Sequence, residues 1–153
     1  MTPPRGEQAT SRAQDAARWL LATGLLVAGA AHLGWLREEF QAQVPSWLGV
    51  DKDAVVVVSG VVEIMLGAAL LLWRERRAAV GWATACFFVL IFPGNIAQLV
   101  ESNDGFGLDT DQARAARLAV QPVLIAVALW STGAWSRWRR RHAPRDETTS
   151  LDG

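Results

Sequence analysis

Four long apolar runs limit more than any other feature how this chain can fold. They cover residues 19–36, 54–73, 78–100 and 118–135, and the charged residues fall almost wholly in the stretches beside them. Each run is close to the roughly 20 residues that a helix needs to cross the hydrocarbon core of a bilayer. A soluble protein of 153 residues needs no such set of segments. The sequence therefore predicts an all-α, polytopic membrane protein with four transmembrane helices.

The ends of the chain are polar. Residues 1–17 predict a disordered tail, and residues 137–153 predict a basic and then disordered tail, so a single transmembrane domain is expected over residues 18–136. A cleavable signal peptide is the alternative interpretation of the first run, because Ala28-Gly29-Ala30 resembles a cleavage site. The apolar run continues past that site to Leu36, which favours a membrane span.

Positive charge predicts the orientation. Eleven of the fifteen Arg and Lys residues lie on the side of the two termini and of the short turn between the second and third runs. Cytoplasmic segments retain positive charge, so both termini are expected in the cytoplasm. The short turn makes the second and third helices antiparallel, and the prediction is an up-down-up-down four-helix bundle. The connections 37–53 and 101–117 are then expected outside.

Composition narrows the chemistry. Cys86 is the one cysteine, so no disulfide and no Cys-x-x-Cys redox pair can form within a monomer. The basic residues are balanced by acids and form no stripe for nucleic acid, which is not expected as a partner. His32 and His142 are predicted on opposite sides of the membrane, and one His with one carboxylate offers too few ligands for a zinc or di-iron site. We therefore expect no metal.

Polar residues gather at one level in the outer half of the predicted bundle. They are His32, Glu63, Asn95, Gln98, Arg117 and Gln121. Asn and Gln often only hydrogen-bond membrane helices to one another. A carboxyl as deep as Glu63 is a candidate functional group, and pairing with His32 or Arg117 would keep it ionised. The sequence predicts a polar pocket in which His32 and Glu63 exchange protons or hydrogen-bond a quinone head.

Small residues predict where helices approach each other. Gly60, Glu63 and Gly67 share one face of the second run. In the first run, Gly24 lies on the same predicted face as His32. Close backbone approach is expected along both faces.

Proline and aromatic residues predict the outer architecture. Pro93 removes an amide donor, so a kink is expected that opens a polar notch beside Asn95.

Most tryptophans suit the membrane interface, and only Trp130 is predicted inside the bundle. The connection 37–53 is expected to lie in the interface and cover the polar site, because its apolar residues recur at helical spacing. They are Phe40, Val44, Trp47 and Leu48.

Short motifs follow one another in an order found in a known family. They are Gly29-Ala30-Ala31-His32, Val44-Pro45-Ser46-Trp47-Leu48, Ser59-Gly60-Val61-Val62-Glu63-Ile64, Phe92-Pro93-Gly94-Asn95-Ile96, and Arg117 with Gln121. In this order, and at these places relative to the four spans, the chain resembles the DoxX-like family over most of its length. The resemblance implies that the family-type residues are His32, Pro45, Glu63, Pro93, Asn95, Arg117 and Gln121.

The resemblance implies a four-helix bundle in the bacterial cytoplasmic membrane. Some DoxX-like proteins are linked to respiratory redox work, notably a quinone-reducing thiosulfate oxidoreductase, and others to membrane-bound oxidant-defence complexes. A subunit or accessory of a quinone-linked redox system is therefore expected, with the lipid bilayer and a membrane redox protein as partners and quinone as the possible cofactor. The alternatives are a component for permeation of ions or small molecules, and a purely structural partner in a membrane complex.

Two departures from the family pattern matter. Leu33 stands where an aromatic residue often follows the histidine. The missing cysteine pair means that the mechanism of thiol-redox four-helix proteins such as vitamin K epoxide reductase does not carry over. The sequence contains no complete catalytic or redox motif, which leaves enzyme activity open.

Overall fold

All secondary structure is helical in the computed structural model, which describes residues 10–102 and 110–143. The long helices are α1 (Arg12–Leu33), α3 (Lys52–Leu72), α4 (Arg77–Val100) and α5 (Asp111–Ser131). The short ones are α2 (Arg37–Gln41), the 3-10 helix η1 (Ser46–Leu48) and α6 (Ala134–His142). By length and composition, each of the four long helices can cross a membrane. The predicted all-α class is confirmed for the described residues, and the four long apolar helices are compatible with the predicted multi-pass membrane protein.

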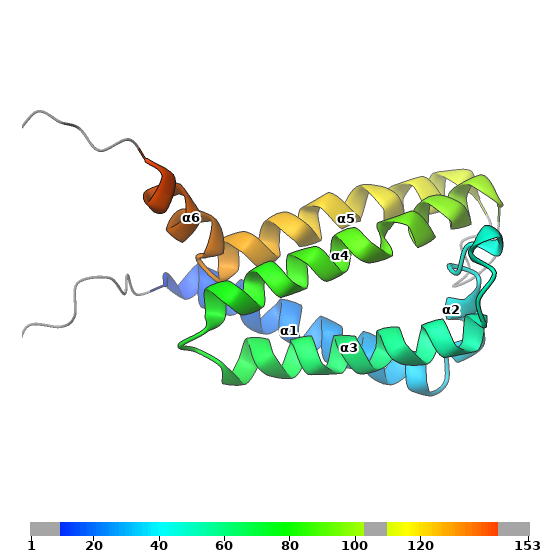
Figure 1. Cartoon of the computed structure of the whole chain (residues 1–153), viewed down its shortest axis with the longest axis horizontal. Coiled ribbons are helices and arrows are strands. Elements are labelled where there is room, and N and C mark those ends of the chain that lie inside the picture. Colours follow the sequence, from blue (N-terminus) through cyan, green and yellow to red (C-terminus); the bar gives the residue numbers. More distant parts are fainter. Residues whose placement is uncertain (1–9, 103–109, 144–153) are drawn as a thin grey trace, which may run out of the picture.

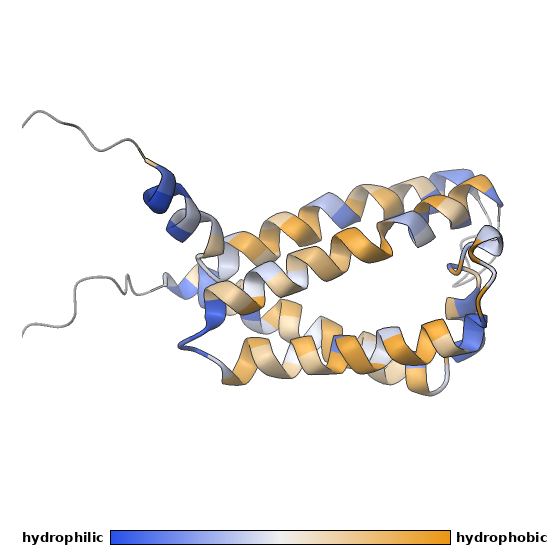
Figure 2. Ribbon diagram, in the orientation of Figure 1, coloured by the Kyte–Doolittle hydropathy of each residue, from blue (hydrophilic) through white to orange (hydrophobic). Residues whose placement is uncertain are grey.

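The long helices pack as two pairs. Helix α1 lies along α3 and helix α4 lies along α5, with further contacts between α1 and α5 and between α3 and α4 (Figure 1). The α3–α4 turn and α6 lie at one end of the molecule, and α2 and η1 lie at the other (Figure 1). Hydrophobic residues follow the four long helices and hydrophilic residues concentrate at both ends (Figure 2). Below, the end with α6 is called the α6 end and the other the α2 end.

Two long helices begin seven residues before their apolar runs. Helix α1 begins at Arg12, because Ser11 Oγ accepts from the Gln14 amide at 3.2 Å and the Gln14 side chain accepts from the Ser11 amide at 3.0 Å. Helix α5 begins at Asp111, because Thr110 Oγ1 accepts from the Ala113 amide at 3.3 Å. The predicted membrane spans begin at residues 19 and 118, because they follow hydropathy, and the first helix is predicted to begin near Asp15. Capping side chains set the observed starts, which for α1 is three residues before Asp15.

The predicted fourth span divides into two helices. Helix α5 ends at Ser131 and α6 begins at Ala134, with Gly133 between them at a φ of 68°. That left-handed conformation suits glycine and ends the helix. The expected continuous span over residues 118–135 is therefore interrupted near its end.

The prediction that Trp130 lies inside the bundle is wrong. Its side chain is 49% exposed. The buried residues of α5 define its core face, and they are Arg114, Gln121, Ala128 and Ser131. Steps of seven and three residues keep side chains on one face of a helix, and position 130 lies outside that face.

Glycines bring α1 and α3 into backbone contact. A Cβ atom added to Gly60 would lie 2.7 Å from the Cβ of His32, and one added to Gly29 would lie 2.6 Å from the Gly60 carbonyl oxygen. At Gly67 it would lie 2.9 Å from the Ala22 carbonyl oxygen. The expected close face of Gly60 and Gly67 is confirmed by these contacts.

The expected close approach at Gly24 is wrong. A Cβ atom there would meet nothing within 4 Å. Gly24 precedes His32 by eight residues, which rotates it by about 80° around the helix. Gly29 lies about 60° from His32 in the opposite direction, on the face of the buried residues Arg18, Ala22 and Leu25, and it is the α1 residue that meets Gly60.

Helices α4 and α5 use a comparable contact. A Cβ atom on Gly81 would lie 2.0 Å from Thr132 Oγ1 and 3.0 Å from the Ala128 carbonyl oxygen. Gly81, Ala85, Phe88 and Asn95 are buried along one face of α4. This packing fixes the α6 end of the α4–α5 pair.

Alanine substitutions at the α1–α3 contact should destabilise the protein selectively. Gly60→Ala is expected to lower the free energy of unfolding by about 1–3 kcal/mol, because the new methyl group overlaps His32 and the Gly29 backbone. Gly24→Ala is the matched control and should leave stability unchanged or raise it, since its Cβ enters open space. Unfolding of the purified protein in detergent measures both. Equal effects of the two substitutions would contradict this packing.

Candidate functional site

Two ionisable side chains meet between α1 and α3. His32 Nδ1 lies 3.0 Å from Glu63 Oε2. The two residues are only 7% and 5% exposed. Glu63 faces α1 because it shares a helix face with the two contact glycines, Gly60 and Gly67. The structure thus brings the predicted His32–Glu63 pair together.

The proton on the imidazole can be assigned to one nitrogen. His32 Nδ1 also lies 2.8 Å from the Ala28 carbonyl oxygen. A carbonyl only accepts hydrogen bonds, so Nδ1 carries a proton. The buried Glu63 Oε2 has no well-directed hydrogen bond, because that N–H points toward Ala28. His32 Nδ1 and Glu63 Oε2 are therefore in close contact without a well-directed hydrogen bond. Both side chains can still form hydrogen bonds with another partner.

Helix α2 covers this pair. The Phe40 ring stacks on the His32 ring with centroids 3.3 Å apart and planes inclined by 17°. Phe40 and Val44 are buried with Ala31 and Val56, whereas Trp47 is exposed. Of the four apolar residues expected to cover the site, Phe40 and Val44 close its α2 end, whereas Trp47 and Leu48 are exposed.

An ion pair fastens that cover to α3. Arg37 Nε donates to Asp53 Oδ1 at 2.6 Å, and a second guanidinium nitrogen contacts Oδ2. The Gln41 side chain donates to the same carboxylate at 3.4 Å. Hydrogen bonding to Asp53 raises the pKa of Arg37 above its ordinary value. The pair is partly exposed, so it positions the cover more than it stabilises the fold.

Amide side chains connect α4 and α5. Asn95 Nδ2 donates to Gln121 Oε1 at 2.9 Å, and Gln121 Nε2 donates to the Phe88 carbonyl oxygen at 2.7 Å. All of these atoms are buried. Helix α4 continues through Pro93, and Gln121 binds a carbonyl in the stretch before that proline, where backbone hydrogen bonding is weakened.

Arg117 connects the two helix pairs. It is partly buried on α5 and interacts electrostatically with Glu63 on α3. Gln98 is 1% exposed, and its Nε2 has no hydrogen-bond partner among the described residues. The predicted site residues thus form a His32–Glu63–Arg117 group and an Asn95–Gln121 pair, and no described contact joins Gln98 to either.

Sequence reasoning missed a buried arginine at the α6 end. Arg18 is 2% exposed, donates to the Leu70 carbonyl oxygen and lies 3.7 Å from Asp15. In the sequence, Arg18 indicates only orientation, as one of the positive charges near the N-terminus. Asp15, one helical turn before it, is the signal that could have indicated a pair.

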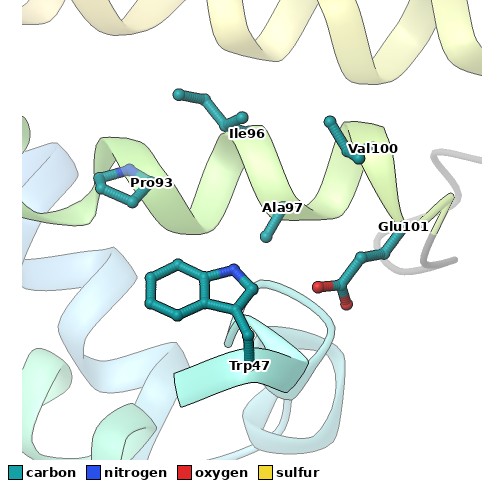
Figure 3. A pocket seen from close by; sticks show the side chains of 6 residues that line it. All are labelled: Trp47, Pro93, Ile96, Ala97, Val100 and Glu101. Atoms are coloured by element: carbon teal, nitrogen blue, oxygen red, sulfur yellow. The ribbon is translucent and has the colours of Figure 1, made fainter.

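The three residues predicted to shape the kink and loop lie near one another. Pro45 is buried and precedes η1, and Trp47 in η1 faces α4. Trp47 and Pro93 line an apolar groove of about 220 Å³ with Ile96, Ala97, Val100 and Glu101 (Figure 3). Ser46 Oγ donates to Glu101 at 2.9 Å and holds the loop there. The groove contains none of the six polar residues predicted for the pocket.

No metal-binding group occurs in the described part of the chain. In residues 10–102 and 110–143, no three His, Cys, Asp or Glu side chains come together as metal ligands do. The arrangement offers proton exchange and hydrogen bonding.

Residues 21–132 match a protein family described as a domain of unknown function (DUF8561). The chain belongs to this family, because the match spans most of its length. No curated protein and no solved structure matches the chain. The similarity to the DoxX-like family stays a prediction.

The amide pair should show measurable coupling. Replacing Asn95 and Gln121 by Leu, singly and together, is expected to give a coupling energy of about 0.6–1.7 kcal/mol, because the two side chains hydrogen-bond in an apolar setting. Detergent unfolding of the four proteins measures it. The control pairs Asn95→Leu with Gln112→Leu, an exposed residue of α5, and should be additive. Additivity in both cycles would contradict the hydrogen bond.

Proposed function

We propose that this DUF8561 family member is a multi-pass protein of the bacterial cytoplasmic membrane. In this proposal it is an up-down-up-down bundle with both termini in the cytoplasm, and it acts as a subunit or accessory of a quinone-linked redox system. The His32–Glu63–Arg117 group binds the polar head of a quinone or a similar lipophilic molecule. The contact of His32 with Glu63 is the observation that carries the proposal.

Burial of these groups supports a functional role. Ionisable side chains within membrane helices are costly, and they mark ligand or proton sites by default. A quinone carbonyl accepts hydrogen bonds and the corresponding quinol donates them. Imidazole with a carboxylate supplies both kinds of partner and can exchange protons with a bound quinone. The incomplete hydrogen bonding of Glu63 Oε2 leaves capacity for a ligand.

A lipophilic ligand would enter sideways. Phe40 stacks on His32 and closes the α2 end. Helices α3 and α4 contact each other less extensively than the partners within each pair. A molecule dissolved in the bilayer therefore reaches Glu63 and Arg117 along the α3–α4 seam, with its tail among the lipids.

Local hydrogen bonding favours this role over permeation. Toward the α6 end, Thr84 donates to the Val80 carbonyl oxygen and Thr132 to the Ala128 carbonyl oxygen, at 2.9 and 2.7 Å. The Arg18 guanidinium is bound to the Leu70 carbonyl oxygen. These side chains hydrogen-bond backbone carbonyls of their own helix or of a neighbouring helix. A path for permeating solutes would need polar side chains that point into it, which argues against permeation.

Quinone binding should depend on Glu63. Ubiquinone and menaquinone analogues with short tails are expected to raise the melting temperature of the purified protein. Glu63→Gln should weaken the binding of the preferred analogue in its reduced, quinol form by at least about tenfold, because the hydroxyl group of the quinol no longer donates a charge-assisted hydrogen bond to the carboxylate. Glu38→Gln, on the exposed side of α2, is the control and should bind normally. No stabilisation by either analogue, or equal weakening by both substitutions, would refute the proposal.

Orientation is tested by labelling in intact cells. In a Cys86→Ala background, Glu38→Cys should react with a membrane-impermeant maleimide added outside. Glu75→Cys, in the α3–α4 turn, should react only after the cells are permeabilised, because the Arg-rich turn is cytoplasmic in this proposal. The reverse pattern would invert the proposed topology.

A further inference from the structure

Helix α6 is set off from the helix that precedes it. Gly133 adopts a left-handed conformation, and α6 diverges from the end of α5 (Figure 1). The turn is held in place, because Thr132 donates to the Ala128 carbonyl oxygen at 2.7 Å and packs on Gly81. Ala134 at the start of α6 is 1% exposed. The direction of α6 is therefore determined by packing at its first turn.

One face of α6 is aromatic. Trp135 and Trp138 stack with ring centroids 5.1 Å apart, and Trp138 contacts the His142 ring at 4.9 Å. Spacings of three and four residues place all three on the same side of the helix. The two indoles are 46% and 43% exposed, which is costly in water and favourable at a membrane interface.

The remaining faces of α6 are strongly basic. Arginines occupy positions 137, 139, 140 and 141, and the helix contains no acidic residue. The helix lies at the α6 end of the molecule (Figure 1). Figure 2 shows this end as hydrophilic beside the apolar helices. An apolar stripe with guanidinium groups around it, next to membrane spans, complements an anionic lipid surface.

We propose that α6 is a docking surface for anionic phospholipids in the leaflet next to the α6 end. Trp135 and Trp138 lie at the boundary of headgroups and acyl chains, and the guanidinium groups of Arg137, Arg139 and Arg141 bind lipid phosphates. The surface is at the opposite end from the His32–Glu63 pair. The inference goes beyond the quinone-linked function and does not depend on it.

Lipid-dependent stability tests this docking surface. With the full-length protein in neutral detergent, phosphatidylglycerol should raise the melting temperature and phosphatidylcholine should not. A triple variant, Arg137→Gln with Arg139→Gln and Arg141→Gln, should need at least about tenfold more phosphatidylglycerol for half of the shift. The control variant, Arg12→Gln with Arg74→Gln and Arg76→Gln, loses the same charge at the same end and should respond as the parent does.

Three results would overturn the inference. Equal losses in the two triple variants would indicate a diffuse charge effect without a role for α6. An unchanged response of the α6 variant would show that these three guanidinium groups do not bind the lipid. Stabilisation by soluble glycerol phosphate, as strong as by phosphatidylglycerol, would indicate a site for free phosphate.

A second measurement tests the aromatic face. Phosphatidylglycerol with bromine on the acyl carbons near the headgroup should quench tryptophan fluorescence of the parent protein. The variant with Trp135→Phe and Trp138→Phe should lose part of that quenching. An undiminished fraction quenched in this variant would place both indoles away from the lipid and contradict the docking geometry.

Discussion

The contact between His32 and Glu63 depends on two helix backbones that touch. An imidazole and a carboxyl are kept in apolar surroundings only where a neighbouring helix provides a partner. Gly29 and Gly60 allow that approach, since a side chain at either position would overlap the opposite helix. The glycines and the ionisable pair are therefore one structural unit. The glycines determine how close α1 and α3 lie, and this distance allows His32 to contact Glu63.

Other features of the α2 end are arranged around this unit. The guanidinium group of Arg117, on α5, interacts electrostatically with Glu63. Phe40 covers the imidazole, and the Arg37–Asp53 pair fastens α2 over it. The α2 end thus contains the buried His32–Glu63 pair, and the α6 end carries an exposed basic and aromatic helix.

The fold was largely predictable because hydropathy reports directly on membrane spans. Hydropathy alone does not predict where α1 and α5 begin. The capping residues Ser11 and Thr110 extend these helices into polar sequence that lies outside the apolar runs. Pairing of His32 with Glu63 followed from a shared depth and a glycine-lined face. Rotation about a helix axis is less visible in sequence, which is why the contact predicted at Gly24 and the interior position predicted for Trp130 are both wrong.

The direct test of the account is the proximity of His32 to Glu63 in a lipid bilayer. Solid-state NMR on protein with ¹⁵N-labelled histidine and ¹³C-labelled glutamate resolves it, and a His142→Gln variant leaves a single imidazole. The structure predicts a protonated Nδ1 and dipolar coupling between that nitrogen and a glutamate carboxyl carbon, which Glu63→Gln abolishes. An unprotonated Nδ1 without such coupling would contradict the account.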